Sequence, residues 1–148
     1  MENQDPATDE KNLFVAPAEV DKLRLIWIGF VVVTFSYALI AWFLSPLEAK
    51  EPGFLRMAVI VAAIISGTMI VVTFLMKSML ASMTRGSYTS FAIVRWAFIE
   101  SMGPLGIILK IFGADTTTAL AFILLSGVLL ATMPPSLNEG EELRQSLR

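Results

Sequence analysis

Four long apolar runs constrain this chain more than any other feature, because a bilayer leaves a backbone few ways to satisfy its hydrogen bonds. The runs cover residues 25–44, 57–76, 91–113 and 117–133. Twenty helical residues measure about 30 Å, the thickness of a hydrocarbon core. Only helices and closed barrels can cross lipid, and these runs are too long and too uniformly apolar for barrel strands. We therefore predict an all-α integral membrane protein, an antiparallel bundle of four transmembrane helices joined by short loops.

The polar ends of the chain set the predicted domain boundaries. Residues 1–20 are acidic and contain two prolines, a composition typical of a disordered tail. Pro17 is nevertheless a suitable first residue for a helix that continues into the first run. We expect a membrane domain over residues 21–135 and a polar C-terminal tail over 136–148.

Lysine and arginine residues are distributed unevenly between the two sides of the predicted bundle. Seven would lie on the side that holds both termini: Lys11, Lys22, Arg24, Lys77, Arg85, Arg144 and Arg148. The other side would hold three, namely Lys50, Arg56 and Lys110. Because the side richer in these residues normally faces the cytoplasm, we predict that both termini are cytoplasmic. This bias is typical of a bacterial inner membrane protein.

The composition excludes several classes of function. The chain has no cysteine and no histidine, so thiol catalysis, Ser-His-Asp chemistry and His/Cys metal sites are not available. No nucleophile–base pair is visible, and we expect neither an enzyme nor a cofactor. The net charge is −2 without a basic patch, which argues against a nucleic-acid partner.

Glu100 is the candidate functional residue, because it lies near the middle of the third apolar run. A carboxyl group in hydrocarbon is costly, and such groups usually face a bundle interior and often mark an ion or proton site. Pro104 follows four residues later and cannot donate to the carbonyl of Glu100. With Gly103 beside it, this proline predicts a kink that leaves the Glu100 carbonyl free.

Hydroxyl groups are predicted at the same depth as Glu100. Ser66 and Thr68 lie at the midpoint of the second run, and Ser101 follows the acid directly. With Glu100 they are a candidate site for a proton or a sodium ion, because hard cations prefer oxygen ligands. The alternative is that these residues only pack and bond their own helices. The small-xxx-small patterns Ala63–Gly67 and Gly127–Ala131 fit close helix packing in the same way.

The faces of the third helix divide its side chains into three groups. We expect Glu100 to face protein, on a surface shared with Ala97, Gly103 and Pro104. The opposite face is predicted to meet lipid and carries Phe98, Met102, Leu105 and Leu109. A third stripe contains Arg95, Ile99, Gly106 and Lys110. Arg95 and Lys110 either reach opposite interfaces, or Arg95 is a counter-charge for Glu100 across helices.

The third run resembles the carboxylate helix of the rotary ATP synthase c subunit, the ring proteolipid. The resemblance rests on Ala97-Phe98-Ile99-Glu100, on Gly106 six residues after the acid, and on Ile107-Ile108-Leu109. The second and third runs, joined by a polar loop with Thr84-Arg85-Gly86, are similar to that family's hairpin. The resemblance implies that Glu100 binds the transported proton or sodium ion. The second run has one glycine, Gly67, where that family has a glycine repeat, which argues against a working rotor subunit and leaves homology and convergence open.

Two functional hypotheses follow. In the first, the chain is a proton- or cation-binding subunit of a homo- or hetero-oligomeric membrane complex, with Glu100 as the ligand. In the second, it is a structural or assembly subunit in which a protonated Glu100 holds helices together by a hydrogen bond. Both are compatible with the chemistry, because hydrocarbon favours the neutral form of a carboxyl group.

Overall fold

The computed structural model describes residues 17–45, 51–75, 88–139 and 142. Its regular structure is entirely helical, with no strand in those residues. The helices are α2 (Pro17–Phe43), α3 (Pro52–Leu75), α5 (Tyr88–Glu100), α6 (Met102–Ile111) and α7 (Thr116–Ala131). The all-α prediction is therefore confirmed.

Three helical segments of the described chain are long and apolar enough to cross a membrane. They are α2 from Glu19, α3, and the combined stretch Tyr88–Ile111 that holds α5 and α6. The fourth predicted span forms α7, an apolar helix of 16 residues. At about 24 Å, α7 is shorter than a typical hydrocarbon core. The fold supports a membrane protein with three candidate spans and one shorter apolar helix.

Prolines mark where two of these helices begin. Pro17 and Pro52 are the first residues of α2 and α3, a position where the missing N–H has no partner to lose. The helix α2 takes in residues 17–20, which the sequence analysis assigned to the N-terminal tail. The remaining tail residues, the loop with Lys77 and Arg85, and most of the C-terminal tail lie outside the described part of the chain.

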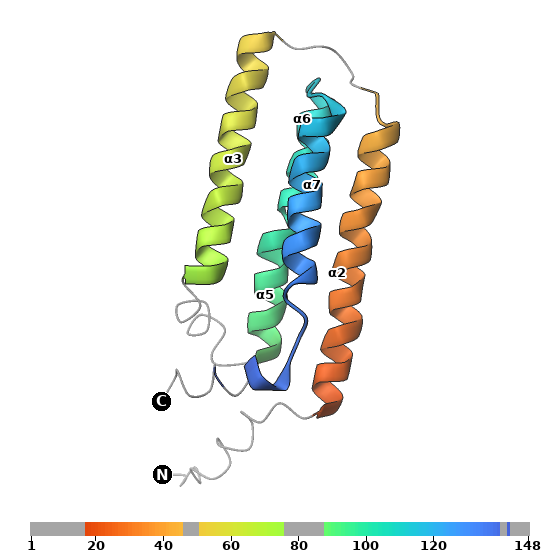
Figure 1. Ribbon diagram of the computed structural model, residues 1–148, viewed down its shortest axis with the longest axis vertical. Coiled ribbons are helices and arrows are strands. Elements are labelled where there is room, and N and C mark those ends of the chain that lie inside the picture. The colour runs from red at the N-terminus through yellow and green to blue at the C-terminus, as the bar shows by residue number, and fades with distance from the viewer. Residues whose placement is uncertain (1–16, 46–50, 76–87, 140–141, 143–148) are drawn as a thin grey trace, which may run out of the picture.

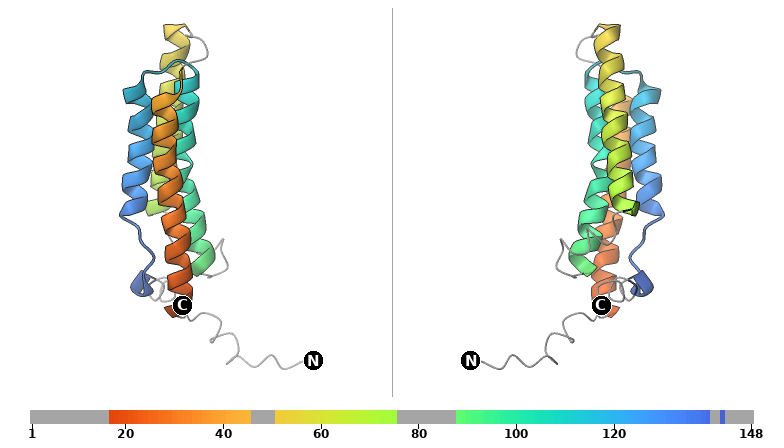
Figure 2. Two further views of the ribbon diagram at one scale, coloured as in Figure 1. Left: turned by 90° about the vertical axis from the view of Figure 1, so that its right-hand side faces the viewer. Right: turned by 90° about the vertical axis from the view of Figure 1, so that its left-hand side faces the viewer.

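The helices form a bundle with α5, α6 and α7 at its centre (Figure 1). In the views of Figures 1 and 2, α2 and α3 lie on opposite sides of these three helices. The segments α5 and α6 contact α2, α3 and α7. The start of α2 and the residues that follow α7 lie at the same end of the bundle. This central position explains why the third run carries all of the charged residues found in the apolar runs.

A closely hydrogen-bonded turn joins α6 to α7. Gly113, with φ 98°, follows α6; its N–H donates to the Lys110 carbonyl and that of Ala114 donates to the Leu109 carbonyl. This pair of bonds is a Schellman motif, and glycine suits its left-handed position. Asp115 then caps α7, because its carboxylate accepts a 2.8 Å bond from the Thr118 N–H. The two ends meet in a turn short enough to make α6 and α7 neighbours.

The predicted lipid face of the third helix is partly wrong. Met102 and Leu109 are buried, whereas Ala97, which was expected to face protein, is exposed. The most buried stripe includes Ile99 and Gly106. The reason is that helices pack around α5 and α6 on several sides, so a single buried face cannot be assigned from the spacing alone.

Candidate functional site

The carboxyl group of Glu100 lies near α2, where it interacts electrostatically with the phenol of Tyr37. Glu100 and Tyr37 are both half-buried. Gly103 makes this approach possible, because a Cβ built there would lie 2.7 Å from Cδ2 of the Tyr37 ring. One edge of the ring thus lies close to the backbone of α6, and its phenol interacts with the acid one turn earlier. Because Gly103 has no side chain, the Tyr37 ring can approach α6 closely enough for its phenol to interact with Glu100.

The helix is interrupted at Ser101, between α5 and α6. Pro104 is the third residue of α6, and in the first turn of a helix its missing N–H is tolerated. Two carbonyl groups at the interruption accept hydrogen bonds from side-chain hydroxyls. Ser101 Oγ donates to the Phe98 carbonyl at 2.6 Å, and Ser126 Oγ of α7 donates to the Ile99 carbonyl at 2.8 Å. The interruption beside Glu100 is thus held by hydrogen bonds within α5 and from α7.

The hydroxyls predicted to join Glu100 have other surroundings. Thr68 is exposed and bonds the Ile64 carbonyl of its own helix. Ser66 is buried, lies in a groove between α3 and α7, and its Oγ has no partner among the described residues. No hydrogen bond within the described chain joins Glu100 to Ser66, Thr68 or Ser101. The candidate site therefore consists of one carboxyl and one phenol, and no group of three acidic, histidine or cysteine residues in the described chain could hold a metal.

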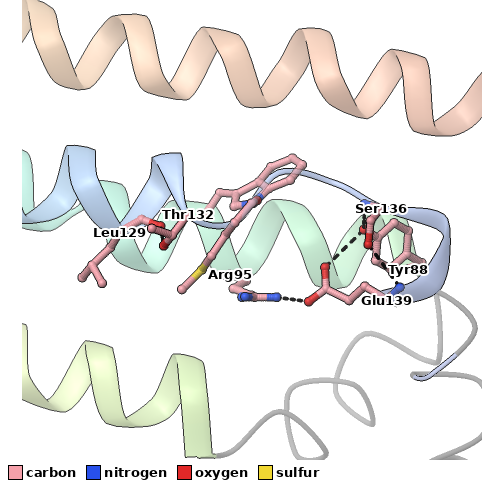
Figure 3. A network of polar contacts seen from close by, with 8 residues as sticks. Tyr88, Arg95, Leu129, Thr132, Ser136 and Glu139 are labelled. Carbon is pink, nitrogen blue, oxygen red and sulfur yellow. Dashed lines mark hydrogen bonds and ion pairs between the residues drawn. The ribbon is translucent and has the colours of Figure 1, made fainter.

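Arg95 is paired with Glu139, not with Glu100. The guanidinium Nη1 forms an ion pair with Oε1 of Glu139, a residue that follows α7. The other carboxylate oxygen, Oε2, accepts a 3.3 Å bond from the Tyr88 hydroxyl. That hydroxyl accepts a 3.0 Å bond from the N–H of Ser136. Figure 3 shows this second polar cluster, in which Tyr88 and Arg95 of α5 meet Ser136 and Glu139.

Lys110 is buried, and its ammonium lies at the turn between α6 and α7. Its Nζ donates a 2.8 Å bond to Oγ1 of Thr116, the first residue of α7. A cation in the last turn of α6 also suits the negative end of that helix. Lys110 thus stabilises the turn on the opposite end of the bundle from Arg95.

The sequence analysis did not name several residues of these polar clusters, Tyr37, Tyr88, Ser136 and Glu139 among them. Tyr37 could have been recognised from the sequence, because it is a phenol inside the first apolar run, and a buried tyrosine hydroxyl usually needs a partner. Glu139 could not have been recognised in this way, because its pairing with Arg95 depends on how the chain turns after α7. Residues that lie 44 positions apart in sequence cannot be paired by helical spacing.

Comparison of the chain with protein families, with curated proteins and with solved structures finds no match. The resemblance to the ring proteolipid therefore stays a prediction. The geometry itself offers a carboxyl group that can hold or release a proton beside a phenol that can donate to it or accept from it.

Proposed function

We propose that this chain is a four-span integral membrane protein of a bacterial inner membrane, with both termini cytoplasmic, in which Glu100 carries an exchangeable proton. The contact of Glu100 with Tyr37 is the observation that carries the proposal. It puts an ionisable group inside a candidate span, and no cation is paired with Glu100 in the described chain. Intramembrane carboxyl groups of this kind usually serve transport or proton transfer.

A proton suits the site better than a sodium ion. A metal cation needs several converging oxygen ligands, whereas Ser101 and Thr68 donate to backbone carbonyls. A proton needs only the carboxyl oxygen, and the Tyr37 hydroxyl can bond the carboxyl in either protonation state. The chain would be a non-enzymatic subunit of a homo- or hetero-oligomer, which agrees with the resemblance of its third run to the ring proteolipid.

Carbodiimide labelling tests the proposal, because carbodiimides modify protonated carboxyl groups in apolar surroundings. We expect modification of Glu100, detected by mass spectrometry, that decreases as the pH is raised and is absent in Glu100→Gln. Tyr37→Phe should change the pH dependence of labelling, because it removes the hydroxyl that interacts with the carboxyl group. Labelling that sodium suppresses at constant pH would show that the site takes sodium instead. An unlabelled Glu100 in the folded protein at every pH would contradict proton exchange.

The contact between α5 and α2 also favours a second candidate, a structural or assembly subunit. A protonated Glu100 would then hold α2 against α5 through Tyr37. In that case Glu100→Gln should unfold like the wild type, because an amide can still bond the phenol, whereas Glu100→Leu should lower the unfolding temperature. Co-purification with a larger membrane assembly in mild detergent, lost only in Glu100→Leu, would support this second role.

A further inference from the structure

Ser126 of α7 is a fully buried serine whose hydroxyl reaches across the bundle to α5. Its Oγ donates a 2.8 Å bond to the Ile99 carbonyl, and both residues are completely buried. Three other hydroxyls of the described helices, those of Thr34, Ser36 and Thr68, donate instead to the carbonyl four residues earlier in their own helix. Such a bond is the usual one for a serine or threonine within a helix. The bond of Ser126 is therefore particular to the contact between α7 and α5.

The acceptor of this bond belongs to the peptide group that carries Glu100. The Ile99 carbonyl carbon is bonded to the Glu100 nitrogen, and the peptide group between them is planar. Holding the carbonyl of that group therefore also holds its nitrogen and restricts where the Glu100 Cα can lie. The helix α5 ends at Glu100 and α6 begins at Met102, so regular helical bonding is interrupted at this point. The hydroxyl of Ser126 thus orients the acid where the helix itself constrains it least.

The helix α7 also lies close to Tyr37, the partner of Glu100. Gly127 follows Ser126, and a Cβ built at Gly127 would lie 3.6 Å from Cγ2 of Thr34. Thr34 is buried and precedes Tyr37 by three residues, so the two are neighbours on the surface of α2. Through two consecutive residues, α7 therefore contacts α2 one turn from the phenol and α5 next to the acid. A change at this point of α7 affects the position of the carboxyl group relative to the phenol.

The titratable groups of the described helices leave Tyr37 as the partner of Glu100. The helix α7 has no titratable side chain, and the one on α3, Arg56, is exposed near the start of that helix. The charged residues of α2 lie near its start. Arg95 and Lys110, which share the candidate span of Glu100, are bound elsewhere, as described above. Within the described chain, titration of the carboxyl group therefore depends on how it lies relative to the phenol.

We propose that Ser126 is a positioning residue for Glu100, through which α7 regulates proton exchange at the carboxyl group. With the hydroxyl bond in place, the peptide group between Ile99 and Glu100 is held, and the carboxyl group keeps one position relative to the Tyr37 phenol. Without it, the Ile99 carbonyl loses a donor in an apolar interior, and the interrupted segment rearranges. The position of a donor relative to a carboxyl group affects the balance between its neutral and ionised forms. This role rests on the proposed function, because it requires an exchangeable proton on Glu100.

The pH profile of carbodiimide labelling at Glu100 tests this role. We expect Ser126→Ala to move the pH of half-maximal labelling by about half a unit, which corresponds to about a threefold change in proton affinity. Ser126→Cys, which keeps the size of the side chain and a weaker S–H donor, should give a smaller shift. Ser36→Ala is the matched control, because Ser36 is exposed and bonds the Val32 carbonyl of its own helix, and it should keep the wild-type profile.

A double-mutant cycle with Tyr37→Phe separates positioning from a general loss of stability. If the hydroxyl acts by placing the carboxyl group against the phenol, Ser126→Ala should shift the profile less in the Tyr37→Phe background than in the wild type. A lower unfolding temperature for Ser126→Ala with an unchanged pH of half-maximal labelling would overturn the positioning role, as would equal shifts in both backgrounds. A wild-type Glu100 that is not labelled at any pH would instead contradict the proposed function, and the positioning role with it.

Discussion

Glycines decide which side chains can meet across the centre of this bundle. Gly103 admits the Tyr37 ring, and Gly106 admits α7: a Cβ at Gly106 would lie 2.6 Å from the Ala119 carbonyl oxygen and 2.8 Å from Ile123 Cγ1. Gly67, in contrast, has nothing within 4 Å of the position of a Cβ. The three positions therefore differ in a way that one substitution can measure.

Replacing each of these glycines with alanine should give a graded series. Gly106→Ala should be the most destabilising, because a backbone oxygen cannot easily move away, and overpacking typically costs about 1–3 kcal/mol. Gly103→Ala should cost less in stability, because the Tyr37 ring can rotate, but it should change the pH dependence of carbodiimide labelling at Glu100. Gly67→Ala, the control, should be neutral or stabilising by up to about 1 kcal/mol. Thermal unfolding in detergent gives the order, and equal effects at all three positions would contradict it.

Asp115 makes a pH-dependent contribution to the start of α7. Hydrogen bonds from the Thr118 hydroxyl and N–H hold the pKa of Asp115 below its usual value. A carboxyl whose pKa is lowered in the folded state contributes stability above its unfolded pKa, and that contribution is lost as the pH falls through the folded value. We expect Asp115→Asn, which keeps a capping side chain, to show less acid destabilisation below about pH 4 than the wild type.

Comparing Asp115→Ala with the wild type at neutral pH measures the contribution of the helix cap itself. Asp115→Ala should be destabilised by about 1 kcal/mol at pH 7, because the Thr118 N–H loses its partner. The measurement is the unfolding temperature of the three proteins over a pH series. If Asp115→Asn and the wild type followed the same acid curve, titration of Asp115 would not contribute to stability.

At the scale of whole elements, the end of α7 is set by two tryptophans. A helix leaves its last carbonyl groups without partners, and in lipid these groups must be satisfied within the protein. Trp27 of α2 donates a 2.8 Å bond to the Leu130 carbonyl, and Trp96 of α5 donates to that of Met133. The two indoles let α7 stop after 16 residues and let the chain continue through residues 133–136 without helical structure.

Removing the indole donors should therefore weaken the bundle. Trp96→Phe leaves the Met133 carbonyl without its indole donor, and such a loss typically costs about 1–3 kcal/mol. Trp27→Phe should cost less, because the Leu130 carbonyl still accepts a bond from the Met133 N–H. Trp42→Phe is a matched control, because Trp42 is 67% exposed near the end of α2. Thermal unfolding should place Trp96→Phe furthest below the control, with Trp27→Phe between them. A control that is as destabilised as Trp96→Phe would show that the ring, and not its N–H, matters.

At the scale of the whole molecule, the sequence predicted elements better than contacts. Apolar runs and prolines located the helices, because burial in lipid requires continuous apolar segments and proline limits where they begin. The contact of Tyr37 with Glu100 depends on how α2 lies against Gly103, and the pair of Arg95 with Glu139 depends on the path after α7. Such contacts come from packing between distant segments, which no local pattern in the chain encodes. The buried Met102 was assigned to lipid for the same reason.

The arrangement of the ends gives a test of the four-span proposal. Residues 21 and 138 belong to the start of α2 and to the segment after α7, at one end of the bundle, whereas residue 45 follows α2 and residue 117 lies in the first turn of α7, at the other end. Four spans put each pair of positions on its own side of the membrane, and the lysine and arginine bias puts the first pair in the cytoplasm. Asp21, Ser45, Thr117 and Asn138 are all exposed, and the natural chain has no cysteine, so each can carry a single introduced thiol.

We expect a membrane-impermeant maleimide added to intact cells to label Ser45→Cys and Thr117→Cys. Asp21→Cys and Asn138→Cys should react only after the membrane is permeabilised. Labelling of Asn138→Cys together with Ser45→Cys in intact cells would mean that α7 does not complete a fourth crossing. That outcome would also place the pair of Arg95 and Glu139 outside the cytoplasm. Because residues 133–139 continue from α7 towards the start of α5, we expect α7 and this segment together to complete the crossing that 16 helical residues alone do not span.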